Sequence, residues 1–398
     1  MSTSRRAGRH FLQIPGPTNV PDRILRAIDR PTIDHRGPDF ERLARSVLDG
    51  LRSIFRTSGP VIVYPASGTG AWEAALVNTL SPGDRVLMAE TGHFATLWCD
   101  LARRLGLEVV LLAGDWRTGI DPARIEAALV EDRSRAIRAV CIVHNETSTG
   151  VRSDVPAVRR ALDRAGHPAL LMVDTISSLA SMDYRHEEWG VDVTVGGSQK
   201  GLMLPPGLSF NAVSPRALEA HRSARLPRSY FDWTAMLEAN RRGFFPYTPA
   251  TNLLYGLEEA IAMLHEEGLE QVFARHERLA RATRAAVVAW GLEIVARYPA
   301  ERSASLTGVL VPEGVDAAAG PALILGRFDL SLGAGLGRHA RRALRIGHLG
   351  DLNELMLMGT LSGVEMGLEA AGVRLAGSGL QAAKRVLLGE PDASRVAA

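Results

Sequence analysis

Lys200 stands in the segment VTVGGSQKGLMLPPGLSF (193–210), directly after a glycine-rich apolar run that is typical of a buried strand. The chain has 46 lysine and arginine residues, and all except Lys200 and Lys384 are arginine, which leaves 44 arginines. A guanidinium stays protonated, whereas a desolvated amine can lose its proton and attack a carbonyl group. The arginine bias therefore favours a chemical role for Lys200 over a structural ion pair. Lys384 lies in the polar segment QAAKRVLLGE and is interpreted as a solvated surface residue.

A second candidate for chemistry follows the apolar run VIVYPA. Ser67-Gly68-Thr69-Gly70 comes directly after this run and precedes the helical pattern AWEAALVNTL. Small residues at a helix N-terminus expose N–H groups and hydroxyls that can surround a phosphate. A plain tight turn with an N-cap is the alternative interpretation. A dinucleotide fingerprint does not fit, because Glu73 occupies the third glycine position.

Two further apolar runs end in polar residues. Asp174 directly follows the run ALLMV, and the segment HNETSTG (144–150) directly follows the run AVCIV. A structural turn is the alternative interpretation of HNETSTG. A carboxylate after a buried run either caps a helix or faces a cation, because burying it without a partner is costly. A lysine that holds an aldehyde, a turn that holds a phosphate and an aspartate that pairs with a pyridine nitrogen are what pyridoxal phosphate needs. These residues therefore predict pyridoxal 5'-phosphate as the cofactor.

Seven short apolar runs must position these residues. They are rich in valine, isoleucine and leucine, as are strands covered on both faces, and they span 61–67, 85–90, 108–114, 139–146, 169–175, 191–197 and 208–214. Amphipathic segments with helix-start signals, such as Asp121-Pro122 and Ser153-Asp154, lie between them. This alternation predicts an α/β fold with a mostly parallel seven-stranded sheet and helices on both faces. Ligands of such sheets bind at the carboxyl ends of the strands.

The sequence pattern changes after about residue 250. Two long helical segments, broken near Gly268, precede weaker strand patterns and a further helix, which predicts a smaller C-terminal α+β domain. The segment 313–326 is expected to be a loop with a short helix. We expect an N-terminal segment (1–22) that contributes to the active site, a large cofactor-binding domain (23–255), a small C-terminal domain (256–385) and a flexible tail (386–398).

Composition narrows the class of protein. A hydrophobic content of 46% and a charged content of 23% are typical of a globular protein, and the net charge of +2 gives no support for a nucleic-acid or membrane partner. The two cysteines, Cys99 and Cys141, cannot build a disulfide framework and indicate a reducing compartment, which we expect to be the cytoplasm. The N-terminus lacks the apolar stretch of a secretory signal. No metal site is expected.

Many motifs in a fixed order resemble class V of the pyridoxal-phosphate-dependent aminotransferases, which have fold type I. The resemblance covers nearly the whole chain. Within this class, the chain is most similar to the serine–glyoxylate and alanine–glyoxylate aminotransferases. HNETSTGV and GSQKGLMLPPGL carry most of it, together with PGPTNVPDRILRAI, SGTGAWEAAL, VDTISSLAS, PYTPATNLLYGLEEAI and LRIGHLGDLNE. Phe94 and Phe245 stand where some members have Trp and Tyr, which favours the serine–glyoxylate group.

The resemblance implies a role for each residue that matches a family motif. Lys200 would bind the cofactor covalently and shuttle the Cα proton, and Asp174 would pair with the pyridine nitrogen. The other implied cofactor contacts are those of Ser67, Gly68, Thr69 and Gln199 with the phosphate, of Phe94 with the ring face, and of Thr147 near the ring oxygen.

The resemblance also implies a shared active site in a homodimer. Thr248 would reach the phosphate bound by the neighbouring subunit. Arg345 would bind the substrate carboxylate through a bidentate pair, and Thr18, Asn19 and Ser178 would line the substrate pocket.

The activity implied is transfer of the amino group of L-serine or L-alanine to glyoxylate, with an amino acid and a 2-oxo acid as substrates. The products would be hydroxypyruvate or pyruvate, together with glycine. Two alternatives from the same class are a ureidoglycine–glyoxylate aminotransferase and a cysteine desulfurase, which needs a nucleophilic cysteine on a mobile loop. A regulatory domain that binds pyridoxal phosphate is the non-enzyme alternative, although no basic stripe accompanies it.

Overall fold

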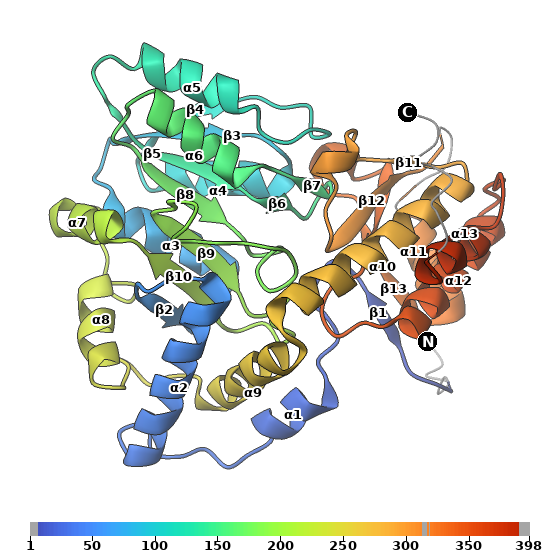
Figure 1. Cartoon of the computed structure of the whole chain (residues 1–398), viewed down its shortest axis with the longest axis horizontal. Helices are drawn as coiled ribbons and strands as arrows, with labels where there is room; N and C mark the ends of the chain where they lie inside the picture. Colours follow the sequence, from blue (N-terminus) through green and yellow to red (C-terminus); the bar gives the residue numbers. More distant parts are fainter. Residues whose placement is uncertain (1–6, 313–316, 318, 390–398) are drawn as a thin grey trace.

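The computed structural model describes residues 7–312, 317 and 319–389 (Figure 1). Its larger sheet confirms all seven predicted strands. These strands are β2 (Val61–Tyr64), β3 (Arg85–Ala89), β4 (Glu108–Leu112), β5 (Ile137–Val143), β8 (Leu170–Asp174), β9 (Val193–Gly197) and β10 (Ser209–Val213).

The order of strands in this sheet is β2-β10-β9-β8-β5-β3-β4. β10 runs antiparallel to both of its neighbours, β2 and β9, and the other neighbouring strands are parallel. The predicted mostly parallel α/β fold is therefore confirmed. β5 ends at Val143, earlier than the predicted run, because Asn145–Glu146 (β6) pairs instead with Val151–Arg152 (β7).

Helices cover both faces of the seven-stranded sheet, as predicted. Along β5, Ala139 and Cys141 belong to one apolar cluster, while Val140 and Ile142 belong to another, because successive side chains of a strand point to opposite faces. The first cluster includes side chains of α3 (Gly68–Thr79), α4 (His93–Arg104), α7 (Pro215–Ser223) and α8 (Trp233–Arg241), and the second includes those of α5 (Pro122–Glu131) and α6 (Val155–Arg164).

The helix-start signals in the sequence are confirmed at α5 and α6. Asp121 and Asp154 are the N-cap residues, and their carboxylates accept hydrogen bonds from Ala123 N and Ala157 N, respectively. Satisfying these amide groups at a helix end typically stabilises the helix by about 1 kcal/mol. The apolar faces predicted for both helices are turned into the core, with Ile125 and Leu129 buried on α5.

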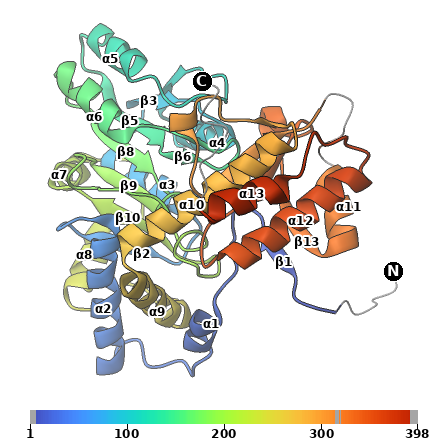
Figure 2. The same ribbon diagram turned by 45° about the vertical axis from the view of Figure 1, so that its right-hand side comes forward.

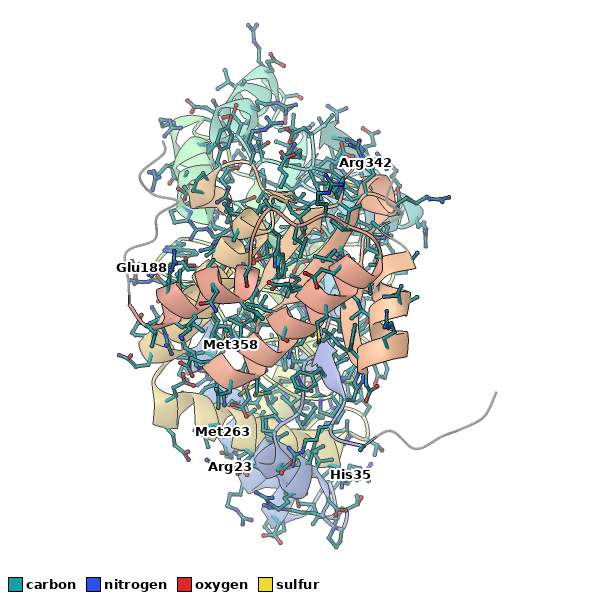
Figure 3. All side chains as sticks on the ribbon, turned by 90° about the vertical axis from the view of Figure 1, so that its right-hand side faces the viewer. Arg23, His35, Glu188, Met263, Arg342 and Met358 are labelled. Carbon is teal, nitrogen blue, oxygen red and sulfur yellow. The ribbon has the colours of Figure 1, made fainter. Side chains whose placement is uncertain are left out.

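A second, five-stranded sheet has the order β1-β13-β14-β12-β11. Its helices pack on one another outside the sheet, and Figure 3 shows α12, with Met358, in front of it. The elements of this part are β1 (Phe11–Gln13), β11 (Glu293–Ile294), β12 (Leu306–Leu310), β13 (Leu330–Ala334), β14 (Ala343–Gly347), α10 (Leu269–Ala289), α11 (Ala319–Phe328), α12 (Glu354–Ala370), α13 (Gly379–Leu387) and the short helices η1 (Pro299–Glu301) and η2 (Gly337–His339).

Three further helices connect the two parts of the molecule. α1 (Asp22–Ile28), α2 (Pro38–Phe55) and α9 (Thr251–Glu267) pack together. Gly268 separates α9 from α10, which runs toward the five-stranded sheet (Figure 2). The apolar side of α9 shares a core cluster with α2 and with β2 and β10.

β1 belongs to the five-stranded sheet although it lies near the N-terminus, and α9 packs with the larger sheet. The domain boundary expected at residue 255 falls inside α9, and the division into domains stays a prediction. The short helix expected within 313–326 is α11, whereas residues 313–316 and 318 and the tail 390–398 lie outside the described residues. No helix in the described part of the chain is long and apolar enough to span a bilayer.

Candidate active site

A cavity of about 230 Å³ lies at the carboxyl ends of β2, β5, β8 and β9. This edge of an α/β sheet is the usual place for a ligand. The cavity brings together every residue predicted to contact the cofactor from within the same subunit. Its lining consists of Gly16, Ser67, Gly68, Thr69, Trp72, Phe94, Val143, Asn145, Thr147, Asp174, Ile176, Ser177, Gln199 and Lys200.

Lys200 follows β9 and is 7% exposed. Its Nζ donates a hydrogen bond to the carbonyl oxygen of Pro15, in the segment that leaves β1. Gly16 has a φ of +96°, and a Cβ added there would lie 2.6 Å from Lys200 Nζ, so glycine is required for this close approach. Burial, followed by the positive charge of Arg345, lowers the pKa of Lys200 to about 8, against an opposing effect of Asp174. The amine is therefore much easier to deprotonate than that of a solvated lysine.

Asp174 ends β8 with its carboxylate held from two sides. Oδ2 accepts a hydrogen bond from Trp72 Nε1 at 3.0 Å, and Oδ1 accepts one from Ile176 N at 2.7 Å. Burial raises the pKa of Asp174 to about 7, and the nearby charge of Glu146 acts in the same direction. A cationic partner in the cavity would lower the pKa of Asp174 again, because a nearby positive charge favours the carboxylate form.

The turn after β2 has the features of an anion site. Ser67 is the N-cap residue of α3, yet its side chain makes no capping hydrogen bond among the described residues. Gln199 Oε1 is buried without a hydrogen-bond partner within the described part of the structure. The helix N-terminus, two hydroxyls and an unsatisfied amide group face one cavity with Lys200 and Asp174. The amide groups and hydroxyls at the start of α3 are donors that fit a phosphate, the Asp174 carboxylate is an acceptor that fits a protonated ring nitrogen, and the Lys200 amine fits an aldehyde.

Arg345 lies next to this cavity on β14. It is 8% exposed, and it donates hydrogen bonds to the carbonyl oxygens of Thr147 and Ala334, both at 2.9 Å. Burial lowers the pKa of Arg345 to about 10, although Glu146 opposes the shift. Thr147 itself lines the cavity and shares a hydrogen bond with Ser177.

The remaining predicted residues do not line this cavity. Thr18 Oγ1 donates to the carbonyl oxygen of Lys200 at 3.3 Å, whereas Asn19 donates to Leu12 O and faces another cavity. Ser178 is fully buried and contacts His144 Nδ1 at 2.9 Å. Thr248 is exposed, just before α9.

Three residues of the site were missed in the sequence. Trp72 donates a hydrogen bond to Asp174, Pro15 accepts one from Lys200, and Glu146 accepts one from the backbone amide of Phe94. Trp72 carries a usable signal, because it follows the phosphate turn by about one helical turn. The contacts of Pro15 and Glu146 join segments far apart in the sequence, and their residue types alone give no such signal.

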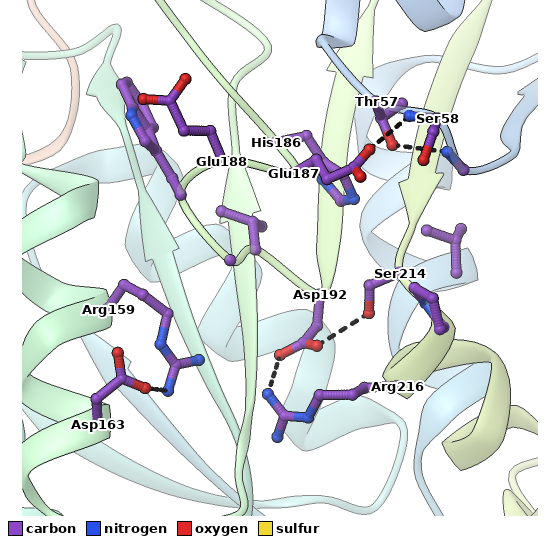
Figure 4. A pocket seen from close by; sticks show the side chains of 16 residues that line it. Thr57, Ser58, Arg159, Asp163, His186, Glu187, Glu188, Asp192, Ser214 and Arg216 are labelled. Atoms are coloured by element: carbon purple, nitrogen blue, oxygen red, sulfur yellow. Dashed lines mark hydrogen bonds and ion pairs between the residues drawn. The ribbon is translucent and has the colours of Figure 1, made fainter.

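A larger cavity, of about 580 Å³, lies at the opposite edge of the same sheet (Figure 4). Several of its charged side chains are engaged in ion pairs or hydrogen bonds. Arg216 and Asp192 form an ion pair at 3.0 Å, as do Arg159 and Asp163 at 2.6 Å, and Glu187 accepts from Ser58 N at 2.6 Å. The combination of a depressed lysine pKa and unsatisfied polar groups is instead found at the carboxyl edge, which identifies the smaller cavity as the candidate site.

Comparison with known proteins gives one consistent family. The family model described as aminotransferase class-V matches residues 11–337. The chain is 50% identical over 398 residues to the serine–glyoxylate aminotransferase of Methylorubrum extorquens, covering 98% of this chain and 99% of the relative. It is 47% identical over 373 residues to the L-aspartate–glyoxylate aminotransferase of Paracoccus denitrificans, covering 93% and 94% of the two chains.

A solved structure agrees with this assignment. The ureidoglycine–glyoxylate aminotransferase of Bacillus subtilis matches with a TM-score of 0.89 and 28% identity over 96% of this chain and 99% of that chain. The similarity thus extends over both sheets and the cavity at the edge of the larger one. This chain belongs to the class-V aminotransferases and has their fold type I architecture.

Proposed function

We propose that the protein transfers the amino group of L-serine, or of L-alanine, to glyoxylate, with pyridoxal 5'-phosphate as cofactor. The products are hydroxypyruvate or pyruvate, together with glycine. The observation that carries the proposal is the buried Lys200 amine, which shares one cavity with Asp174 and an uncapped phosphate turn. The choice of donor and acceptor is supported by the 50% identity to a serine–glyoxylate aminotransferase over almost the full chain.

Each part of the cofactor has a matching group in the cavity. Ser67, Gly68, Thr69 and Gln199 would hold the phosphate, Asp174 would accept a hydrogen bond from the ring nitrogen, Phe94 would cover the ring face, and Thr147 would lie near the ring oxygen. Pyridoxal phosphate, when bound, supplies an aldehyde that binds amino groups reversibly and a ring that accepts electrons from Cα.

Lys200 Nζ is the group that moves protons. Its pKa of about 8 allows both the ammonium and the free amine near neutral pH, which general acid–base work at one atom requires. Arg345 would bind the substrate carboxylate. Its guanidinium is pre-oriented by two carbonyl oxygens, which reduces the entropy lost on binding.

We also propose a homodimer in which Thr248 completes the site of the partner subunit. The exposed position of Thr248 supports this arrangement. Tyr230 is 50% exposed, and its ring stacks on that of Tyr247, the residue before Thr248, with 4.5 Å between the ring centroids. This aromatic surface is available to a partner subunit. Two free, buried cysteines support the cytoplasm as the compartment.

The cysteine chemistry of a desulfurase has little support in this chain. Cys99 and Cys141 are both buried in the apolar cluster around α4 and β5. Burial raises the pKa of Cys99 to about 12 and raises that of Cys141 further. A thiol is nucleophilic as its thiolate, so these cysteines are poorly suited to attack a substrate.

A Lys200→Ala variant tests the proposed function. It is expected to lose the absorbance band that the covalent link to Lys200 gives the cofactor, and to lower turnover roughly 10²–10⁴-fold, because the proton-transfer group is gone. Lys384→Ala is the matched control, since Lys384 is exposed on α13, and it should behave as the wild type. An unchanged spectrum and rate in Lys200→Ala would contradict the assignment.

A panel of amino donors with glyoxylate tests the substrate. L-serine or L-alanine should give the highest kcat/KM. In single turnovers, the same donor should convert the cofactor to its amine form, which absorbance spectra can follow. L-aspartate and ureidoglycine belong in the same panel, because relatives of this chain carry those names. Faster turnover of either would replace the proposed donor and leave the reaction type unchanged.

A further inference from the structure

The helix that carries Phe94 has a cap that comes from another element. Gly92 is the N-cap of α4 and has no side chain to offer. Glu146 instead accepts hydrogen bonds from Phe94 N at 3.3 Å and Ala95 N at 3.0 Å. Ser148 Oγ accepts from His93 N at 2.9 Å and donates to Glu146 Oε1 at 2.7 Å. The first three amide groups of α4 are therefore bound by the segment that follows β5.

The same arrangement explains the glycine at position 92. A Cβ there would lie 2.4 Å from Glu146 Cγ and 2.5 Å from Ser148 Oγ, so these two side chains fill the space that a side chain at position 92 would need. The φ of Gly92 is 167°, which is extended backbone open to any residue. Its role is thus to make room for Glu146.

We propose that Glu146 is a positioning residue that holds the first turn of α4, and with it the Phe94 ring, in place against the cofactor cavity. The inference rests on the proposed function, because it assigns Phe94 to the face of the cofactor ring. Phe94 is the second residue of α4 and lines the cavity with Lys200 and Asp174. A helix end without a cap frays, and a frayed first turn would release this ring.

The chemistry of a carboxylate suits this position. Oε1 of Glu146 accepts from Phe94 N, Ser148 N and Ser148 Oγ, while Oε2 accepts from Ala95 N. Both oxygens must accept, so an amide in place of the carboxylate would turn an NH₂ group toward at least one N–H donor. The negative charge is also favourable at the N-terminus of a helix.

A second role for Glu146 would be electrostatic, because its charge acts on Asp174 and Arg345. The two roles make different predictions for one double variant. In Gly92→Ser/Glu146→Ala, the serine enters the space that Glu146 vacates and caps α4 locally, while the negative charge is absent. Ser148 Oγ can rotate away about its Cα–Cβ bond.

The test measures the Kd of pyridoxal phosphate for the apoprotein by absorbance titration, together with the Tm of each apoprotein. Glu146→Gln, which is close to isosteric, and Glu146→Ala are each expected to weaken cofactor binding by about tenfold or more, as for a lost N-cap. Gly92→Ser alone should also weaken binding, because its Cβ overlaps Glu146. The double variant should recover an affinity within about threefold of the wild type, as a restored serine N-cap would.

Glu365→Gln is the matched control. Glu365 holds the N-terminal region of α13 in a similar way, through Leu380 N at 3.2 Å and Ser378 Oγ at 3.1 Å, but it lies in the five-stranded part. Its substitution should lower Tm and leave the Kd of pyridoxal phosphate unchanged. A Kd that merely follows Tm across all variants would overturn the positioning role.

The outcomes separate this inference from the proposed function. A wild-type protein that binds no pyridoxal phosphate contradicts the proposed function and the inference with it. A wild type that binds normally, beside a Glu146→Gln variant of equal affinity, contradicts only the inference. A double variant no better than Glu146→Ala also contradicts it, because local capping would then have failed to replace Glu146.

Discussion

At the scale of single residues, Asp174 and Lys200 are both shifted toward their neutral forms. Burial raises the pKa of the carboxyl to about 7 and lowers the pKa of the amine to about 8. Each shift reflects a cost of burying charge that the apoprotein bears until the cofactor binds. Such a cost at a cavity wall is typical of functional groups, because structural groups are usually paired.

Asp174→Asn should change how the stability of the apoprotein depends on pH. Because its pKa is higher in the folded chain than in the unfolded chain, Asp174 binds more protons when folded between about pH 4 and 7. The free energy of unfolding should therefore fall by on the order of 2 kcal/mol from pH 5 to pH 8 on account of this group. Denaturant titrations at the two pH values should show that the free energy of unfolding of Asp174→Asn depends less on pH than that of the wild type. The lowered pKa of Lys200 acts in a separate window above pH 8, where stability rises with pH.

Residue types and their places after apolar runs were sufficient to predict part of the candidate site, and the family resemblance supplied the rest. Lys200 was distinguished by an arginine-rich background, and Asp174 and Ser67 by their places after apolar runs. Pro15 and Glu146 were not predictable in this way, because each acts through a hydrogen bond to a residue far away in the chain. Local patterns carry no information about which distant segment supplies a cap or an acceptor.

At the scale of elements, two helices of the larger sheet begin with a serine that is used differently. Ser214 caps α7 by accepting from Ala217 N at 3.1 Å, whereas Ser67 at the start of α3 makes no such bond among the described residues. Ser67 faces the cavity instead. One N-cap serine therefore stabilises a helix, and the other is available to a ligand.

Matched substitutions of these two serines should separate stability from binding. Ser214→Ala is expected to lower the stability of the apoprotein by at least about 1 kcal/mol, because it removes both the cap and the hydrogen bond that Ser214 Oγ donates to the buried Asp192, and to leave cofactor affinity unchanged. Ser67→Ala should leave the stability of the apoprotein unchanged and should weaken the binding of pyridoxal phosphate. Thermal unfolding and absorbance titration measure the two quantities, and equal behaviour of the two variants would contradict this division.

The sequence pattern predicted the strands of the larger sheet better than it predicted their order or the strands of the smaller sheet. Continuous apolar runs identify strands that are covered on both faces, but they do not encode the order of strands or the antiparallel direction of β10. β1 and β13 escaped prediction because FLQ is three residues long and LSLGA contains two glycine or alanine positions. Their pairing depends on tertiary contacts.

At the scale of the whole molecule, the proposed dimer should complete the phosphate site. Thr248→Ala is expected to weaken cofactor binding several-fold and to leave the dimer intact, since a threonine hydroxyl contributes about 1 kcal/mol through one hydrogen bond. Analytical ultracentrifugation and absorbance titration measure the two effects. The exposed Ser223 provides a control, and Ser223→Ala should change neither. A monomeric wild type that binds the cofactor tightly would contradict the shared site.

The pairing of β1 with β13 has a consequence for the order of folding. Phe11 lies opposite Leu330, so β1 cannot join its sheet until the chain has been synthesised almost to the end. Contacts between segments this far apart in the sequence form slowly, so we expect this pairing to be a late event. Because Pro15 closely follows β1, we expect its carbonyl to reach Lys200 only after the strands of the seven-stranded sheet, which end at Val213, have been synthesised. We therefore expect Lys200, the proposed catalytic residue, to stay uncovered until late in folding.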